Sequence, residues 1–305
     1  MATGLDAMLH RRRPGAWQLF LRQPCIYLAR LLLSWRPVTP LQPLAKDDAL
    51  SIVCISDTHN SQPQLPDGDV LIHAGDLTQS GTFSELEATL AWLRRQPHSV
   101  KIVVAGNHEL LLDANQRGRR PEDERLYSAL DWGDIVYLEN EETTITCPRN
   151  GRQLRVYGSP LSPRHGNWAF QYPPAHDAWS HQHPPISPGI DILITHAPPK
   201  AHLDLELGCV HLLRTLWRVR PKLHVFGHVH EGAGTEWVQF TALQVAYEQT
   251  VVDKGGLFNL GWVLFYFLQD YFWPAPTTNK CLLVNAAMVG GLRDDEIRRP
   301  VQAVL

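Results

Sequence analysis

The sequence predicts an α/β protein built around buried strands. Five short apolar runs have the length and composition of buried strands, and segments with helical spacing lie between several of them. These runs are Ile52 to Ile55, Val70 to Ile72, Ile102 to Ala105, Ile192 to Ile194, and Leu223 to Phe226. The chain has 305 residues, of which 44% are hydrophobic, so it can bury a full core. We therefore expect one large α/β domain with appendages.

The remaining elements follow from the same patterns. Helical spacing covers Phe83 to Arg95, Glu122 to Leu130, and Leu203 to Val219. Shorter strands are predicted around Ile135 to Leu138, Thr143 to Thr146, and Leu154 to Tyr157. Residues 1–45 form a basic, apolar N-terminal arm and a proline-rich linker. Residues 46–305 form the main domain, with an aromatic-rich insertion near residues 255–275.

Polar residues that can bind metal follow each of the five apolar runs. In chain order they are Asp57 and His59, Asp76, Asn107 and His108, His196, and His228 and His230. In an open α/β sheet the carboxyl ends of the strands line a common crevice, so residues that are distant in sequence can converge there. The sequence therefore predicts a shared polar site at that edge.

These segments resemble the calcineurin-like metallophosphoesterase superfamily, whose pattern is D-x-H, G-D, G-N-H-E/D, a single H, and G-H-x-H. The segments Cys54 to Asn60, Val156 to Pro160, Thr195 to Pro199, and Val284 to Ala287 are further similar to the small phosphodiesterases of the metallophosphoesterase-domain-containing (MPPED-like) group. The resemblance implies a four-layer α/β/β/α sandwich, with two facing mixed sheets flanked by helices. Protein Ser/Thr phosphatases match less well, because the segment Gly75 to Gly81 lacks their arginine.

Oxygen and imidazole ligands suit divalent ions, and two such ions about 3.5–4 Å apart can clamp a phosphate. Asp76 is the expected bridge, because a carboxylate offers one oxygen to each ion. Asp57 and His59, together with Asp76 and His230, are expected around the first ion, an assignment that the family shares. By resemblance, Asn107 joins His196, His228 and Asp76 around the second ion. Manganese is the first expectation, and iron, zinc and magnesium are alternatives.

We predict His108 and Asp76 as the catalytic residues. His108 neighbours a predicted ligand, and a positioned imidazolium can protonate a departing alkoxide. Asp76 would hold both ions and the bridging hydroxide that attacks the phosphorus in line. Glu109 is expected to orient the loop that carries His108.

The predicted function is hydrolysis of small phosphodiesters such as cyclic nucleotides. One alternative is a phosphomonoesterase that acts on a nucleotide or a protein. Others are a nucleotide-binding regulatory protein with slow turnover and a membrane-associated scaffold with a vestigial site. Residues 1–40 carry six arginines and one acid, a net charge of +5, so the rest of the chain has a net charge of −8 within the total of −3. Because affinity for long nucleic acid comes from many contacts between basic residues and phosphates, long nucleic acid is not an expected partner. The sequence does not indicate an oligomeric state.

The five cysteines are scattered and predict buried thiols in a reducing compartment, so we expect a cytoplasmic protein. Two apolar segments, Trp17 to Trp35 and Leu257 to Trp273, are too interrupted to span a membrane. They are expected either to contact an anionic membrane peripherally or to pack on the domain or on each other. The arginine-rich arm also permits a mitochondrial presequence, a weaker alternative, and no signal peptide is evident.

The long segment Pro163 to Pro188 is rich in proline, histidine and aromatic residues. Long loops of this kind are usually functional or disordered, and this one precedes His196. We expect it either to border the metal crevice, where aromatic faces could stack on a nucleobase, or to cover the sheet edge. A separate metal site at His181 and His183 is not favoured, because no acid or cysteine lies at ligand spacing.

Overall fold

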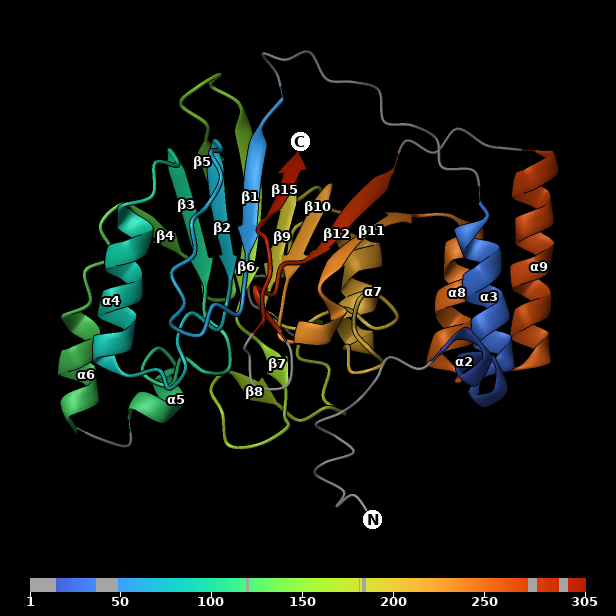
Figure 1. Cartoon of the computed structure of the whole chain (residues 1–305), viewed down its shortest axis with the longest axis horizontal. Coiled ribbons are helices and arrows are strands. Elements are labelled where there is room, and N and C mark those ends of the chain that lie inside the picture. Colours follow the sequence, from blue (N-terminus) through green and yellow to red (C-terminus); the bar gives the residue numbers. More distant parts are fainter. Residues whose placement is uncertain are drawn as a thin grey trace. The chain divides into compact units, whose positions relative to one another are not determined.

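The computed structural model describes residues 15–36, 49–118, 121–180, 182, 185–273, 279–290 and 296–305. Its strands form two mixed sheets (Figure 1). The first sheet has the order β15 (Val301–Val304), β1 (Ser51–Ile55), β2 (Val70–Ala74), β3 (Val100–Val104), β4 (Ile135–Tyr137). The second has the order β11 (Gly234–Gln239), β12 (Lys280–Asn285), β10 (Leu223–Phe226), β9 (Ile192–Thr195), β6 (Gln153–Ser159), β5 (Glu141–Thr146).

The strands that precede the predicted ligands run parallel within each sheet. β1, β2, β3 and β4 are parallel, and β15 joins β1 antiparallel. In the second sheet β12, β10, β9 and β6 are parallel, and β5 joins β6 antiparallel. Two short pairs are added, β7 (Ser162–Pro163) with β8 (Gln171–Tyr172), and β13 (Val289–Gly290) with β14 (Glu296–Ile297). Parallel pairing places the carboxyl ends of β1, β2 and β3 at one edge of the first sheet. It likewise places the carboxyl ends of β9 and β10 at one edge of the second sheet.

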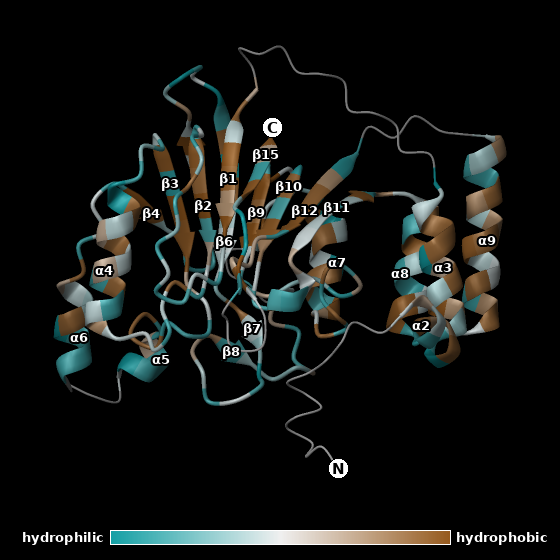
Figure 2. Ribbon diagram, viewed as in Figure 1, coloured by the Kyte–Doolittle hydropathy of each residue, from teal (hydrophilic) through white to brown (hydrophobic). Residues whose placement is uncertain are grey.

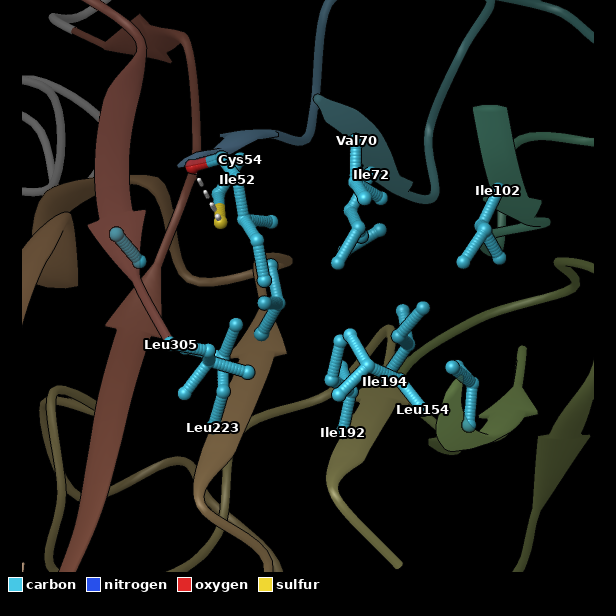
Figure 3. Packing of buried hydrophobic residues seen from close by; sticks show 14 of the residues in the cluster. Ile52, Cys54, Val70, Ile72, Ile102, Leu154, Ile192, Ile194, Leu223 and Leu305 are labelled. Carbon is cyan, nitrogen blue, oxygen red and sulfur yellow. Dashed lines mark hydrogen bonds between the residues drawn. The ribbon is translucent and has the colours of Figure 1, made fainter. Parts of the chain in front are cut away.

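The main hydrophobic core lies between the two sheets. Ile52 and Ile72 of the first sheet belong to the same buried cluster as Ile192 and Leu223 of the second (Figure 3). Alternate residues of the first sheet point the other way: Val53 and Leu71 pack with Leu86 of α4 in a second cluster. Burial of both faces explains why these strands are continuously apolar in the sequence.

Helices flank the sheets, as the family resemblance implied. Within the unit that contains both sheets the helices are α4 (Phe83–Arg94), α5 (Ala114–Arg117), α6 (Pro121–Ser128), α7 (Val210–Val219) and the short 3₁₀ helix η1 (His230–Gly232). Figure 1 shows α4 and α6 beside the first sheet and α7 beside the second. α4 begins with a capping box, in which the Thr82 hydroxyl accepts from the Glu85 backbone and the Glu85 carboxylate accepts from Thr82. The prediction of two facing mixed sheets flanked by helices is confirmed.

The helix predicted from Leu203 to Val219 is shorter in the structure, where α7 begins at Val210. Leu203, Leu205 and Glu206 all have positive φ, which is incompatible with a helix. The Asp204 carboxylate instead accepts hydrogen bonds from the backbone amides of Ala201 and Gly208, at 3.3 and 2.9 Å. A local turn therefore replaces the predicted first helical turns.

The chain divides into two compact units. One contains the described parts of Met1–Gln42 and Val238–Lys280, and the other those of Pro43–Trp237, Cys281–Gly290 and Glu296–Leu305. The first unit holds α2 (Ala16–Arg22), α3 (Pro24–Ser34), α8 (Ala242–Val252) and α9 (Leu257–Phe272), and we call it the helical unit. The second unit contains every predicted metal ligand. The predicted boundary between residues 45 and 46 lies outside the described residues.

A buried histidine in β10 makes the stability of the fold sensitive to acid. His224 is fully buried, and its Nε2 donates to Thr195 Oγ1 at 2.8 Å, because that hydroxyl already donates its own hydrogen to the Ala197 carbonyl. Burial lowers the pKa of His224 to about 3. The unfolded chain binds this proton near the ordinary histidine pKa of 6.5, so stability is lost as the pH falls from 6.5 towards 3.

We expect His224→Gln to weaken this dependence, because glutamine retains an N–H donor but does not titrate. Urea unfolding measured from about pH 7 to about pH 4 should give a wild-type slope that is steeper by up to about 1.4 kcal/mol per pH unit. The exposed His176→Gln serves as the control. Equal slopes in the wild type and His224→Gln would contradict the assignment of a neutral buried ring.

Candidate metal centre

Four predicted ligands form a first group. The metal-binding atoms of Asp57, His59, Asp76 and His230 all lie within 4.8 Å of one another. His230 Nε2 is 3.2 Å from Asp57 Oδ1 and 3.3 Å from His59 Nε2, while His59 Nε2 is 3.9 Å from Asp76 Oδ2. Loops that follow β1, β2 and β10 supply these side chains.

A second group shares Asp76 with the first. Asp76, His196 and His228 also have their metal-binding atoms within 4.8 Å of one another. His196 Nε2 lies 3.3 Å from Asp76 Oδ2 and 3.0 Å from Asn107 Oδ1. The structure therefore brings together all seven residues that the sequence singled out as metal ligands, and Asp76 belongs to both groups.

The donor atoms fit two divalent cations. His196 Nδ1 lies 3.0 Å from the Ala74 carbonyl, which can only accept, so this nitrogen carries a hydrogen and Nε2 is the nitrogen that faces the site. Burial lowers the pKa of His196, but Asp76 outweighs it and raises the pKa to about 9, so the ring is cationic here and would release the Nε2 proton on binding a metal. His59 Nε2 and His230 Nε2 approach to 3.3 Å beside two carboxylates, an arrangement that a shared cation would favour. Carboxylate, amide and imidazole donors without thiolate suit manganese, iron, zinc or magnesium.

The carboxylates of the site remain ionised at neutral pH despite their burial. Burial raises the pKa of Asp57, but the hydrogen bond and charge of His230 outweigh it and lower the pKa to about 2. Burial likewise raises the pKa of Asp76, but His196 outweighs it and holds the pKa well below its usual range. Burial, together with the charge of His196, lowers the pKa of His228 to about 3, so its ring is neutral and available as a ligand.

Several ligand loops adopt a backbone conformation that non-glycine residues rarely take. The φ angles are 51° at Asp57, 43° at His59, 51° at Asp76 and 67° at His228. Such residues are uncommon in this region and cluster at functional sites. The Asp57 amide donates to the Gly75 carbonyl at 2.8 Å and the His59 amide to the Asp76 carbonyl at 3.2 Å, so the two loops hold each other in place.

Two motif glycines allow the loops to approach closely. A Cβ added at Gly106 would collide with the Asp76 carboxylate and backbone, and one added at Gly227 would collide with the side chains of Asp57 and Ser56. Any larger residue would therefore displace a metal-binding carboxylate. This explains why glycine precedes both Asn107 and His228.

His108 lies beside the metal-binding groups without belonging to either. Its Nδ1 donates to the Gln79 carbonyl at 2.6 Å, and its backbone amide donates to Asp76 Oδ1 at 2.9 Å. The His108 ring stands edge-on to His59 at 4.6 Å and stacks on Trp168 at 4.4 Å between centroids. Glu109 does not reach the metal groups: its carboxylate accepts from Thr78 and from the Gly106 amide, which orients the loop.

The segment Pro163 to Pro188 has two structural roles. Its first part borders the site, where Trp168 stacks on His108 and the His165 ring lies 4.9 Å from His228. Its later part is packed inside the protein, where the buried Trp179 donates through Nε1 to the Tyr172 hydroxyl at 3.1 Å. The first part of the segment therefore borders the site, as one of the two expectations stated, and stacking on a nucleobase stays a prediction. His181 and His183 lie outside the described residues.

The comparison with known families agrees with this geometry. The sequence pattern of the family described as "Calcineurin-like phosphoesterase" matches residues 50–232. The chain belongs to this family. The family is one of metal-dependent phosphoesterases, and the two groups of ligands in this chain form a plausible binuclear metal site.

Related proteins extend the match beyond these residues. Metallophosphoesterase domain-containing protein 1 of Homo sapiens is 40% identical over 227 residues, which are 64% of this chain and 67% of that protein. UPF0046 protein T07D4.2 of Caenorhabditis elegans is 35% identical over 232 residues, 67% of this chain and 58% of that protein. "Probable rhamnogalacturonate lyase C" of Emericella nidulans is 45% identical over 98% of this chain. Our chain spans only 28% of that longer protein.

Two buried histidines that sequence reasoning missed support the ligand loops of this metallophosphoesterase. His73 of β2 donates through Nε2 to Thr58 Oγ1 at 2.9 Å, and that hydroxyl donates to the Leu77 carbonyl. His224 of β10 contacts Thr195 in the same way. The sequence does carry a signal, because each is a single histidine within an apolar strand.

Two further residues hold the loop of His228 and His230. Asn285 donates through Nδ2 to the Val229 carbonyl at 2.9 Å and to the Leu203 carbonyl at 3.1 Å. Arg298 donates through Nη1 to the His230 carbonyl at 2.6 Å. No local pattern around Arg298 indicates this role, because its partner lies 68 residues away in the sequence.

We expect Asp76→Asn to lower metal content and hydrolysis together. The substitution removes the negative charge common to the two groups of ligands while preserving side-chain size. Elemental analysis of the purified variant should show less than two metals per chain, and turnover should fall in parallel. The exposed Asp67→Asn is the matched control. Two metals per chain with unchanged turnover in Asp76→Asn would refute the shared role.

Proposed function

We propose that this metallophosphoesterase is a phosphodiesterase that acts on small substrates such as cyclic nucleotides. The observation that carries the proposal is the placement of His108, which lies next to the metal-binding groups and is not part of them. Because its Nδ1 is committed to the Gln79 carbonyl, Nε2 is the nitrogen left for proton transfer. A phosphodiester with an alkoxide leaving group requires such a donor.

When bound, two divalent ions would activate water and offset the negative charge of the phosphate. The chain's own residues supply orientation and a proton. The backbone amide of His108 donates to Asp76 Oδ1 at 2.9 Å, which ties the proton donor to the carboxylate common to both groups. Stacking on Trp168 fixes the plane of the His108 ring, so a protonated Nε2 can be held towards the leaving oxygen.

The charge around the site favours diesters over monoesters. Phosphatases that act on dianionic monoesters commonly add arginine to bind the extra charge. The Gly75 to Gly81 segment carries no arginine, and the rings of Trp168 and His165 border the two groups instead. Aromatic faces of this kind are suited to stacking on a nucleobase.

Two other functions remain candidates. A phosphomonoesterase acting on a nucleotide or protein would use the same ligands. A regulatory nucleotide-binding protein with slow turnover would retain a nucleotide after purification and would hydrolyse only about one equivalent.

The reaction class is tested with full-length protein stripped of metal and reloaded separately with manganese, zinc, iron and magnesium. We expect hydrolysis of bis-nitrophenyl phosphate and cyclic nucleotides over many turnovers, at rates above that for nitrophenyl phosphate. A faster monoester rate would favour the first alternative. Retained nucleotide with a single turnover would favour the second.

The role of His108 gives a separate prediction. His108→Ala should leave metal content near the wild-type value and reduce turnover of diesters with alkoxide leaving groups by about 10²–10⁴-fold. The loss should be smaller for nitrophenyl esters, whose leaving group hardly needs a proton. His176→Ala, which replaces an exposed histidine of the Pro163 to Pro188 segment, is the control. An equal loss on both substrate classes would assign His108 to the phosphate or the metals.

A further inference from the structure

The helical unit packs the two apolar segments of the sequence against each other. α3 contacts both α8 and α9, and it buries Ile26, Ala29 and Leu33. Arg30 of α3 and Arg36, two residues after its end, also contact α8: Arg30 donates to the Tyr247 hydroxyl at 3.4 Å and Arg36 to Gln244 Oε1 at 2.7 Å. The N-terminal helices and the late aromatic segment are therefore parts of one structure.

α9 remains largely exposed after this packing. The structure describes all 16 residues of α9, and only Val263 is buried. Large apolar side chains recur at helical spacing along the open side, with exposed fractions of 77% at Phe258, 55% at Phe265, 43% at Leu268 and 63% at Phe272. Figure 2 shows hydrophobic colouring along much of this helix. A helix on the surface of a water-soluble domain normally turns its polar side outward, and α9 does the reverse.

The residue types on this surface are those of a lipid interface. Tyr271 and Trp273 at the end of α9 are 62% and 75% exposed, and Trp17 of α2 is 69% exposed. Tryptophan and tyrosine concentrate at the boundary between lipid tails and headgroups, because the ring is apolar and carries a polar group. We call the exposed residues Leu257, Phe258, Leu264, Phe265, Leu268, Tyr271, Phe272 and Trp273 the α9 face.

The charge of the same unit complements an anionic surface. Residues 1–42, 238–280 and 291–295, which make up this unit, together contain nine Lys and Arg residues and six Asp and Glu residues. The rest of the chain contains 19 Lys and Arg residues and 25 Asp and Glu residues, so the unit that carries the α9 face has a net positive charge and the other unit a net negative charge. Net positive charge opposes pairing of this unit with a second copy of itself and favours negatively charged lipid.

From these observations we propose that the helical unit docks on the surface of an anionic lipid bilayer, with the α9 face in the interface. The association is peripheral: among the described residues, no helix is long and apolar enough to cross a membrane. Side chains of the α9 face enter the boundary between headgroups and tails, and the basic residues add electrostatic attraction. This proposal is independent of the reaction that the metal centre performs.

The test is co-sedimentation of the full chain with vesicles of phosphatidylcholine containing phosphatidylserine, and with phosphatidylcholine alone. We expect binding to the anionic vesicles that weakens as salt is raised, with much less binding to the neutral ones. The double variant Phe265→Gln/Leu268→Gln should bind anionic vesicles at least about tenfold more weakly. Val304→Gln, which replaces a 58% exposed residue of β15, is the matched control and should bind like the wild type.

Two further measurements keep the outcome interpretable. Circular dichroism and phosphoester hydrolysis should be unchanged in the double variant, because both substitutions are exposed and lie outside the unit with the metal ligands. Light scattering identifies self-association, and hydrogen exchange without lipid reports whether α9 is already covered. The proposal is overturned if the wild type fails to bind anionic vesicles at low salt. It is also overturned if the α9 face instead holds a lipid-free dimer that the double variant dissociates.

Discussion

The metal centre depends on the sharing of one carboxylate between two groups of ligands. Asp76 lies within ligand distance of His59 and His230 on one side and of His196 and His228 on the other. Its burial would favour the neutral acid, but His196 reverses this and keeps it ionised. A neutral side chain at this position would leave two cations facing each other with no negative charge between them. The loops from both sheets are therefore arranged around this residue.

The ligand loops adopt an unfavourable backbone conformation, and the packing of the two sheets stabilises the protein enough to maintain it. Asp57, Asp76 and His228 have positive φ, and such strain persists only where the surrounding structure determines it. The strands before them are fully buried and belong to a core that both sheets share. Hydrogen bonds from His73 and His224 then connect β2 to Thr58 in the loop after β1, and β10 to Thr195 at the end of β9. Stability and ligand placement thus rest on the same buried strands.

The two compact units differ in the kind of surface that they expose. In the unit with both sheets, apolar side chains are largely enclosed between the sheets and under α4. In the helical unit, α9 buries only Val263 of its 16 residues and carries little charge. An exposed apolar surface of this extent is unusual for a domain surrounded by water. This contrast with the unit that contains both sheets supports our proposal that the helical unit docks on a lipid surface.

The sequence by itself determined which buried strands precede the site and which ligands follow them, because Asp57, Asp76 and His196 each come just after an apolar run. The tertiary structure alone decided that α7 begins only at Val210, since the turn around Asp204 depends on side-chain hydrogen bonds. It also decided the roles of His73, His224 and Arg298, whose partners lie 15, 29 and 68 residues away. The spacing of apolar residues in the sequence indicates which face of a helix or strand is buried. It does not indicate which distant polar group a buried polar side chain will contact.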